Sequence, residues 1–368
     1  MKKKLHFALV LALPLTVVAL GAETNETPVF ERVFAWASVT DEDSARAYAD
    51  IGVTDIGASG EKGVAAAKKF GMRPYCGFFP VGPHSQVLTP AERAFYDYIN
   101  GTDLRGVVPK EEIGGKVNAR RVEKKCQFGG EPVEPLDLCP ELISCFLSDE
   151  GQAMAKSRMA AMLEKNPLAE GITFDYIGYA NLRSCACDDC RRRLSAWLAE
   201  KGLPETEANR NIFFRDSLVN YVNAMVDYAK TLRPGIKVAI HLYPVFLPDP
   251  LYGRLLKADY IEETVAWYFQ WDDAKIADYT RRILSAPHLA GCRSIPFVGL
   301  NAAEGTPLAH KTPERLEREL ELVLAAGGRD VAVCNGPDMV KPGYREVFKR
   351  HTRGGLSAMA GAAEKSAK

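Results

Sequence analysis

Gly-Ile-Thr-Phe-Asp-Tyr-Ile, residues 171–177, is a short apolar segment with one acidic residue, Asp175, near its end, and a helical pattern over 191–201 follows it. A short apolar run followed by a helix is typical of one βα unit of a parallel sheet. The same order recurs along the chain. We predict strands at Val33–Val39, Thr54–Ala58, Arg73–Phe79, Gly171–Ile177, Lys237–Tyr243, Thr264–Phe269, Ser294–Leu300 and Asp330–Cys334.

Helical patterns lie between these strands, and each is followed by a Gly or Pro breaker; they cover 41–51, 61–70, 151–164, 191–201, 212–232, 274–285 and 313–326. Eight strands in alternation with helices predict a single (β/α)8 TIM barrel, of the α/β class, over residues 23–353. An open doubly wound sheet is the alternative, but no Gly-rich phosphate fingerprint follows the first strand. The Ala/Gly/Lys-rich residues 354–368 are predicted to be a disordered tail.

The first 22 residues have the features of a cleaved signal peptide. Lys2, Lys3 and Lys4 precede an apolar run from Phe7 to Leu20, and the small residues Gly21-Ala22 follow it. The run is short for a membrane span, so we expect a secreted or periplasmic protein with no membrane contact after cleavage. Lys+Arg and Asp+Glu both number 47, so net charge favours neither nucleic acid nor anionic lipid as a partner.

Three thiols within six residues, Cys185, Cys187 and Cys190, are too close together to pair with one another without strain. They form half of a metal-binding knuckle, which a fourth thiolate would complete as a tetrahedral zinc site. A long, Gly- and Pro-rich loop over 81–147 follows the third strand and contains Cys126, Cys139 and Cys145. Disulfides to Cys126 or Cys145 are the alternative to zinc.

Cys139-Pro140, then Cys185-x-Cys187-x-x-Cys190, then Leu194 and Trp197-Leu198, resemble family-42 β-galactosidases over about residues 138–202. The resemblance implies a barrel with a structural zinc on Cys139, Cys185, Cys187 and Cys190, which would pin the long loop. Cys145 is the rival fourth ligand. Four thiolates leave no open coordination position for Lewis-acid chemistry. Members of that family often form dimers or trimers, so the resemblance leaves a homo-oligomer open.

The catalytic residues of that family are not matched here. Its members end the fourth strand in Asn-Glu, whereas this chain has Phe174-Asp175, and the seventh predicted strand contains no carboxylate. β-Galactosidase activity therefore does not transfer. An Asp at this position resembles the nucleophile of α-galactosidase-, α-glucosidase- and α-fucosidase-like barrels.

We therefore predict a glycoside hydrolase, most simply a retaining one, with Asp175 as nucleophile and Glu263 or Glu262 as the acid/base. Asp272 and Asp273 are the alternative partners if the sixth strand ends at Phe269. The other alternative is that both glutamates are exposed at the barrel's bottom edge. Side chains at predicted strand ends are candidates for binding the carbohydrate substrate, namely Trp36, Tyr176, His241, Tyr243 and Trp267. The rival hypothesis is a non-catalytic carbohydrate-binding barrel.

Overall fold

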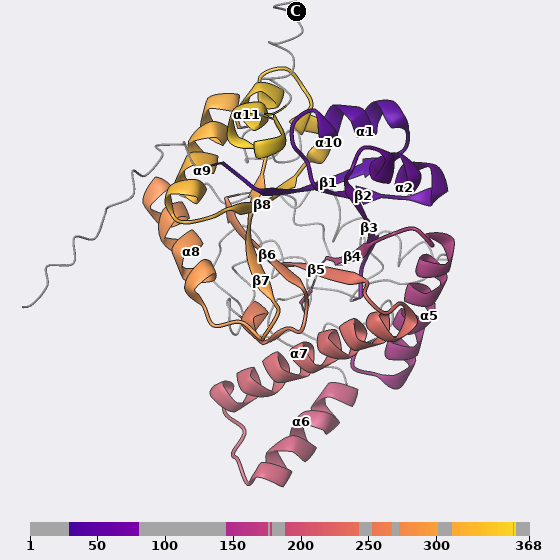
Figure 1. Ribbon diagram of the computed structural model, residues 1–368. Helices are drawn as coiled ribbons and strands as arrows, with labels where there is room; N and C mark the ends of the chain where they lie inside the picture. Colours follow the sequence, from indigo (N-terminus) through magenta and orange to yellow (C-terminus); the bar gives the residue numbers. More distant parts are fainter. Residues whose placement is uncertain are drawn as a thin grey trace, which may run out of the picture.

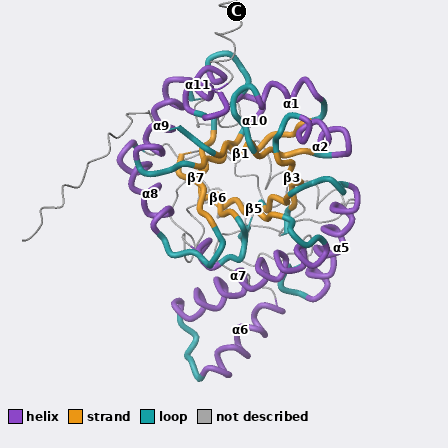
Figure 2. Tube along the Cα trace, in the orientation of Figure 1, coloured by secondary structure: helices purple, strands orange, loops and turns teal. Residues whose placement is uncertain are grey.

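A computed structural model describes residues 29–80, 145–175, 177–178, 188–242, 252–266, 272–300, 311–355 and 357. Eight parallel strands form a closed barrel in chain order, which confirms the predicted TIM barrel (Figures 1 and 2). The strands are β1 (Arg32–Val39), β2 (Asp55–Ala58), β3 (Arg73–Phe78), β4 (Gly171–Phe174), β5 (Lys237–Leu242), β6 (Tyr260–Ala266), β7 (Arg293–Gly299) and β8 (Asp330–Cys334).

Helices surround the barrel wall (Figure 2). They are α1 (Glu42–Ala49), α2 (Gly60–Lys69), α5 (Asp149–Lys165), α6 (Asp188–Lys201), α7 (Glu207–Leu232), α8 (Asp273–Ser285), α9 (Pro313–Ala325), α10 (Gly336–Met339) and α11 (Tyr344–His351), with a 3-10 turn, η2 (Tyr252–Leu255). Several begin at a side-chain cap, as the sequence suggests; Asp41 forms a capping box with Ser44 at the start of α1. None of the helices in the described part of the chain is long and apolar enough to cross a membrane.

β6 begins at Tyr260, four residues earlier than the predicted strand Thr264–Phe269, so that prediction was wrong at this element. The cause is the acidic pair Glu262-Glu263, which resembles an exposed approach to a strand but is wholly buried within it. The short helices α10 and α11 were not predicted. The predicted signal peptide and most of the long loop and the tail lie outside the described residues.

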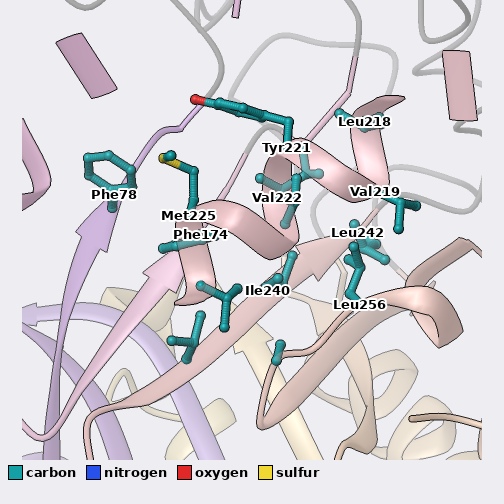
Figure 3. Packing of buried hydrophobic residues seen from close by; sticks show 14 of the residues in the cluster. Phe78, Phe174, Leu218, Val219, Tyr221, Val222, Met225, Ile240, Leu242 and Leu256 are labelled. Atoms are coloured by element: carbon teal, nitrogen blue, oxygen red, sulfur yellow. The ribbon is translucent and has the colours of Figure 1, made fainter. Parts of the chain in front are cut away.

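The outer faces of the strands form most of the apolar core together with the helices. On the β3–β5 side, Phe78, Phe174 and Ile240 pack under α7, whose Val222 and Met225 point toward the sheet (Figure 3). Successive side chains of a strand point to opposite faces, so every second residue faces the barrel interior. A contact between side chains of two strands that are not neighbours must cross the interior. Such contacts therefore identify the residues that face inward.

The lower part of the interior is filled by large and charged side chains. The rings of Phe34 and Tyr75, from β1 and β3, lie 4.6 Å apart edge to face. A Cβ atom on Gly171 would lie 2.0 Å from Cε1 of Tyr75, so β4 can start beside this ring only with glycine. Asp55, fully buried, accepts two hydrogen bonds from Arg73, at 2.7 and 2.6 Å. These side chains fill the amino-terminal end of the barrel interior.

Candidate active site

Asp175 directly follows β4, at the carboxyl end of the strands. Its backbone N–H donates to the carbonyl oxygen of Phe78 at 3.1 Å, which continues the pairing of β3 with β4 by one residue. Its side chain is 14% exposed, so the carboxyl group is largely, but not wholly, buried. This is the end of a TIM barrel at which active sites are found.

His241 holds the Asp175 carboxylate in place from the neighbouring strand, β5. Its Nδ1 lies 2.9 Å from Asp175 Oδ1, and its Nε2 lies 2.9 Å from the hydroxyl of Thr264 on β6. In the tautomer that carries its proton on Nδ1, His241 donates to the carboxylate of Asp175, and Nε2 accepts from the hydroxyl of Thr264. The ring also stacks on Phe297, with centroids 4.0 Å apart and planes 20° apart.

The prediction that His241 binds substrate directly is not met by this geometry, because the residue is only 1% exposed. Both ring nitrogens already have protein partners. His241 is therefore a buried histidine whose two ring nitrogens are both hydrogen-bonded. One of its partners is the candidate catalytic carboxylate, Asp175.

Trp36, on β1, is half-buried and makes a polar contact across the barrel. Its indole Nε1–H donates to Oε2 of Glu262 on β6, at 2.6 Å. β1 and β6 are not neighbours in the closed sheet, so this hydrogen bond crosses the interior. The indole ring also meets His241 and Phe297 edge to face, with centroid distances of 5.3 and 5.7 Å.

Glu262 is fully buried in the interior beneath Trp36. Loss of solvation raises the pKa of its carboxyl group to about 8, and the negative charges of Asp55 and Asp175 act in the same direction. The indole hydrogen bond and the guanidinium of Arg32 oppose this shift only in part. At neutral pH Glu262 is therefore mostly a neutral carboxylic acid.

Glu263 is on the opposite face of β6, as adjacent strand residues must be. Its Oε1 lies 4.0 Å from Nε2 of His288 and near Gly253 of η2, both outside the barrel wall. The prediction that Glu263 is the acid/base is therefore wrong in its geometry, because its carboxyl group does not share the interior with Asp175. Exposure of the two glutamates at the bottom edge is also wrong, since they are 0% and 2% exposed.

Asp272, which was predicted as an alternative partner of Asp175, has a structural role in the described chain. It is the N-cap of α8, where its side chain accepts a hydrogen bond from the backbone N–H of Lys275 at 2.8 Å. Among the other predicted substrate-binding residues, Tyr176, Tyr243 and Trp267 lie outside the described residues.

Sequence reasoning missed two residues that complete this site, Thr264 and Phe297. Both were placed in predicted strands, but neither was assigned to the interior. Counting every second residue from Glu262 along β6 reaches Thr264, so correct strand limits would have put it on the same face. Phe297 offers no comparable signal, because an aromatic residue in a buried strand is ordinary core.

The thiols of Cys145 and Cys190 lie 3.5 Å apart in the structure. This is far beyond the length of a disulfide bond, about 2.05 Å. Two thiolates bound to one tetrahedral zinc at about 2.3 Å would be about 3.8 Å apart, so this pair of sulfur atoms fits such a site. Cys139, Cys185 and Cys187 lie outside the described residues.

Fold and site together define a (β/α)8 barrel with an oriented carboxylate at the end where its strands terminate. Neither a known family model nor a curated protein matches the sequence. The structure is similar to the PgaB (BpsB) glycoside hydrolase domain from Bordetella bronchiseptica, with a TM-score of 0.53, 11% identity, and coverage of 89% of this chain and 99% of that domain.

Two longer enzymes share the fold. A GH42 β-galactosidase from G. stearothermophilus has a TM-score of 0.52 and 12% identity, with 88% of this chain and 56% of that one covered. The α-L-fucosidase isoenzyme 2 from Paenibacillus thiaminolyticus has a TM-score of 0.51 and 13% identity, with 91% and 50% covered. The chain thus spans about half the length of these two proteins, and identities this low show a shared fold alone.

Proposed function

We propose that this protein is an exported glycoside hydrolase that cleaves a glycosidic bond in an oligo- or polysaccharide. The observation that carries the proposal is the chain of hydrogen bonds from Thr264 through His241 to Asp175, at the carboxyl end of the barrel and beside the half-buried Trp36. The fold is one on which glycoside hydrolases are built, as the PgaB domain and the GH42 enzyme illustrate.

In the proposed reaction Asp175 is the nucleophile. The Nδ1–H of His241 fixes the carboxylate in one orientation and stabilises its negative charge. One oxygen of Asp175 forms a bond to the anomeric carbon while the bond to the leaving oxygen breaks, and that oxygen takes a proton from a general acid. Water then attacks the anomeric carbon and gives a proton to the conjugate base of that general acid, while the bond to Asp175 breaks; this restores the carboxylate and retains the anomeric configuration.

Retention requires a second carboxyl group about 5–5.5 Å from the nucleophile. Glu263 faces away from the interior, and Glu262 lies fully buried beneath Trp36. We therefore assign the nucleophile to Asp175 and do not assign proton donation to either of these glutamates.

The proposal is tested by Asp175→Asn, which keeps the size of the side chain but removes the attacking oxygen's charge. On a panel of aryl α- and β-glycosides and natural oligosaccharides we expect turnover to fall about 10³-fold or more. Asp227→Asn, at an exposed carboxylate on α7, is the control and should retain parental turnover. Parental turnover in Asp175→Asn would contradict the assignment. A parent that binds sugars but hydrolyses none of the panel would favour the carbohydrate-binding alternative.

We also propose a structural zinc held by Cys185, Cys187, Cys190 and one further thiolate, either Cys139, as the resemblance implies, or its rival Cys145. The support is the 3.5 Å separation of the Cys145 and Cys190 sulfur atoms. Such a closed shell would stabilise the fold and take no part in the reaction. Elemental analysis of Cys145→Ser and Cys139→Ser distinguishes the ligands, because only the variant that removes a ligand should lose zinc and melt at a lower temperature. A parent purified without metal would contradict the site.

A further inference from the structure

We propose that Glu262 is a positioning residue, which fixes the indole ring of Trp36 as a stacking platform for a sugar ring and does not itself act as the acid/base. The inference rests on the proposed function in one respect, namely that the sugar binds at this end of the barrel. It assigns Glu262 a role distinct from the catalytic one that its position in the sequence suggested.

Three contacts restrain the indole ring of Trp36. The hydrogen bond to Glu262, at 2.6 Å, turns the N–H edge of the indole into the barrel. His241 and Phe297 contact the ring edge to face, with interplanar angles of 61° and 73°, and so set its plane. The Trp36 side chain is only half-buried, and the apolar face of an aromatic ring stacks on the C–H face of a sugar.

The backbone of Trp36 is restrained as well. A Cβ atom on Gly336, at the start of α10, would lie 2.7 Å from the carbonyl oxygen of Trp36 and 2.4 Å from Cβ of Ala37. α10 therefore packs directly on this part of β1. A platform held at both its backbone and its ring can bind a sugar without first losing conformational freedom.

Burial argues against a direct chemical role for Glu262. The residue is 0% exposed, and the indole nitrogen occupies the approach to Oε2. A glycosidic oxygen could reach this carboxyl group only if the side chains around it moved. The charged groups that influence it are Arg32 on β1, Asp55 on β2 and Asp175 beyond β4, and the two aspartates both favour its neutral form.

Two substitutions of similar shape separate the positioning role from an acid/base role. Glu262→Gln keeps a carbonyl oxygen that can accept from the indole N–H but cannot serve as an acid. Glu262→Met removes the acceptor and leaves a buried indole N–H without a partner. A positioning role predicts that Gln binds oligosaccharide within about threefold of the parent, and that Met binds at least about tenfold more weakly. An acid/base role predicts unchanged binding in both variants and loss of turnover in both.

The decisive measurement needs no ligand. In ¹⁵N-indole-labelled protein, the Trp36 N–H resonance, identified by its absence in Trp36→Phe, should exchange slowly with solvent in the parent and in Glu262→Gln. It should shift and exchange faster in Glu262→Met.

Binding is measured by calorimetry with cellotetraose, chitotetraose and galactotetraose as probes. In a Trp36→Phe background, Glu262→Met should weaken binding by less than about twofold, because the residue acts through the indole.

Three results would overturn the proposal. The first is an unchanged indole resonance in Glu262→Met. The second is Glu262→Gln that keeps its binding and its indole resonance but loses turnover about 10³-fold, which would make Glu262 the proton donor. The third is a parent that binds none of the probes, which would remove the platform role. A parent that binds but hydrolyses nothing contradicts the glycoside hydrolase and leaves this proposal standing.

Discussion

The raised pKa of Glu262 makes the stability of the whole barrel depend on pH in a way that one substitution can isolate. In the unfolded chain the carboxyl group has its ordinary pKa near 4.5, whereas in the folded protein burial raises the pKa to about 8. Between these values the folded state binds a proton that the unfolded state has lost. The free energy of unfolding must therefore fall as the pH rises from 4.5 to 8.

The size of the effect follows from the difference between the two pKa values, 3.5 units. One unit corresponds to about 1.4 kcal/mol, so the contribution of Glu262 is complete below pH 4.5 and decreases by about 5 kcal/mol by pH 8. Glu262→Gln has no titrating group at this position and escapes the loss. We expect the variant to become progressively more stable than the parent as the pH rises.

The measurement is urea unfolding of the parent and Glu262→Gln at half-unit intervals from pH 4.5 to 8.5, followed by circular dichroism. Other groups titrate equally in both proteins, so the difference between the two curves isolates Glu262. Glu200→Gln, at an exposed residue of α6, is the matched control and should give a curve parallel to the parent. Parallel curves for Glu262→Gln would refute the reasoning, because they would mean that the buried carboxyl titrates alike in both states.

Two further substitutions test the supports of the site. Thr264→Val keeps the shape of the side chain but removes the hydroxyl 2.9 Å from Nε2 of His241; we expect turnover to fall about tenfold, with recovery in Thr264→Ser, measured as kcat at saturating substrate. Gly171→Ala places a methyl group 2.0 Å from the ring of Tyr75; we expect a loss of about 1–3 kcal/mol of stability, seen as a lower melting temperature, whereas unchanged melting would show that the ring can move aside.

The fold could be predicted because strands buried on both faces are apolar runs, and seven of the predicted strands match observed ones within a few residues. β6 could not be placed in the same way. Its interior carries Glu262 and its outer face carries Glu263, so the apolar run is broken at the point where the strand is most deeply buried. A prediction based on hydrophobicity places such a strand too far along the chain, at the next apolar stretch. For this reason the predicted strand begins at Thr264, whereas β6 begins at Tyr260.

The candidate site was predictable only in part, for a geometric reason. Asp175 could be found because it ends an apolar strand, and strand ends on one side of a barrel converge. The hydrogen bond between Trp36 and Glu262 joins residues 226 positions apart and depends on how the barrel closes. Strand order and register determine such a contact, and neither can be read from a single sequence.

The two glutamates show how one position along a strand decides which environment a carboxyl group enters. Adjacent carboxyl groups of the same length lie in different environments. Glu262 accepts from the indole of Trp36 in the interior, where the charges of Asp55 and Asp175 act on it, and Glu263 lies 4.0 Å from His288 outside the barrel wall. Burial of Glu262 keeps it neutral, so it adds little negative charge to the interior that it shares with Asp175. The carboxyl group that His241 contacts is that of Asp175, and the alternation of β6 places Glu262 on the interior face and Glu263 on the opposite face.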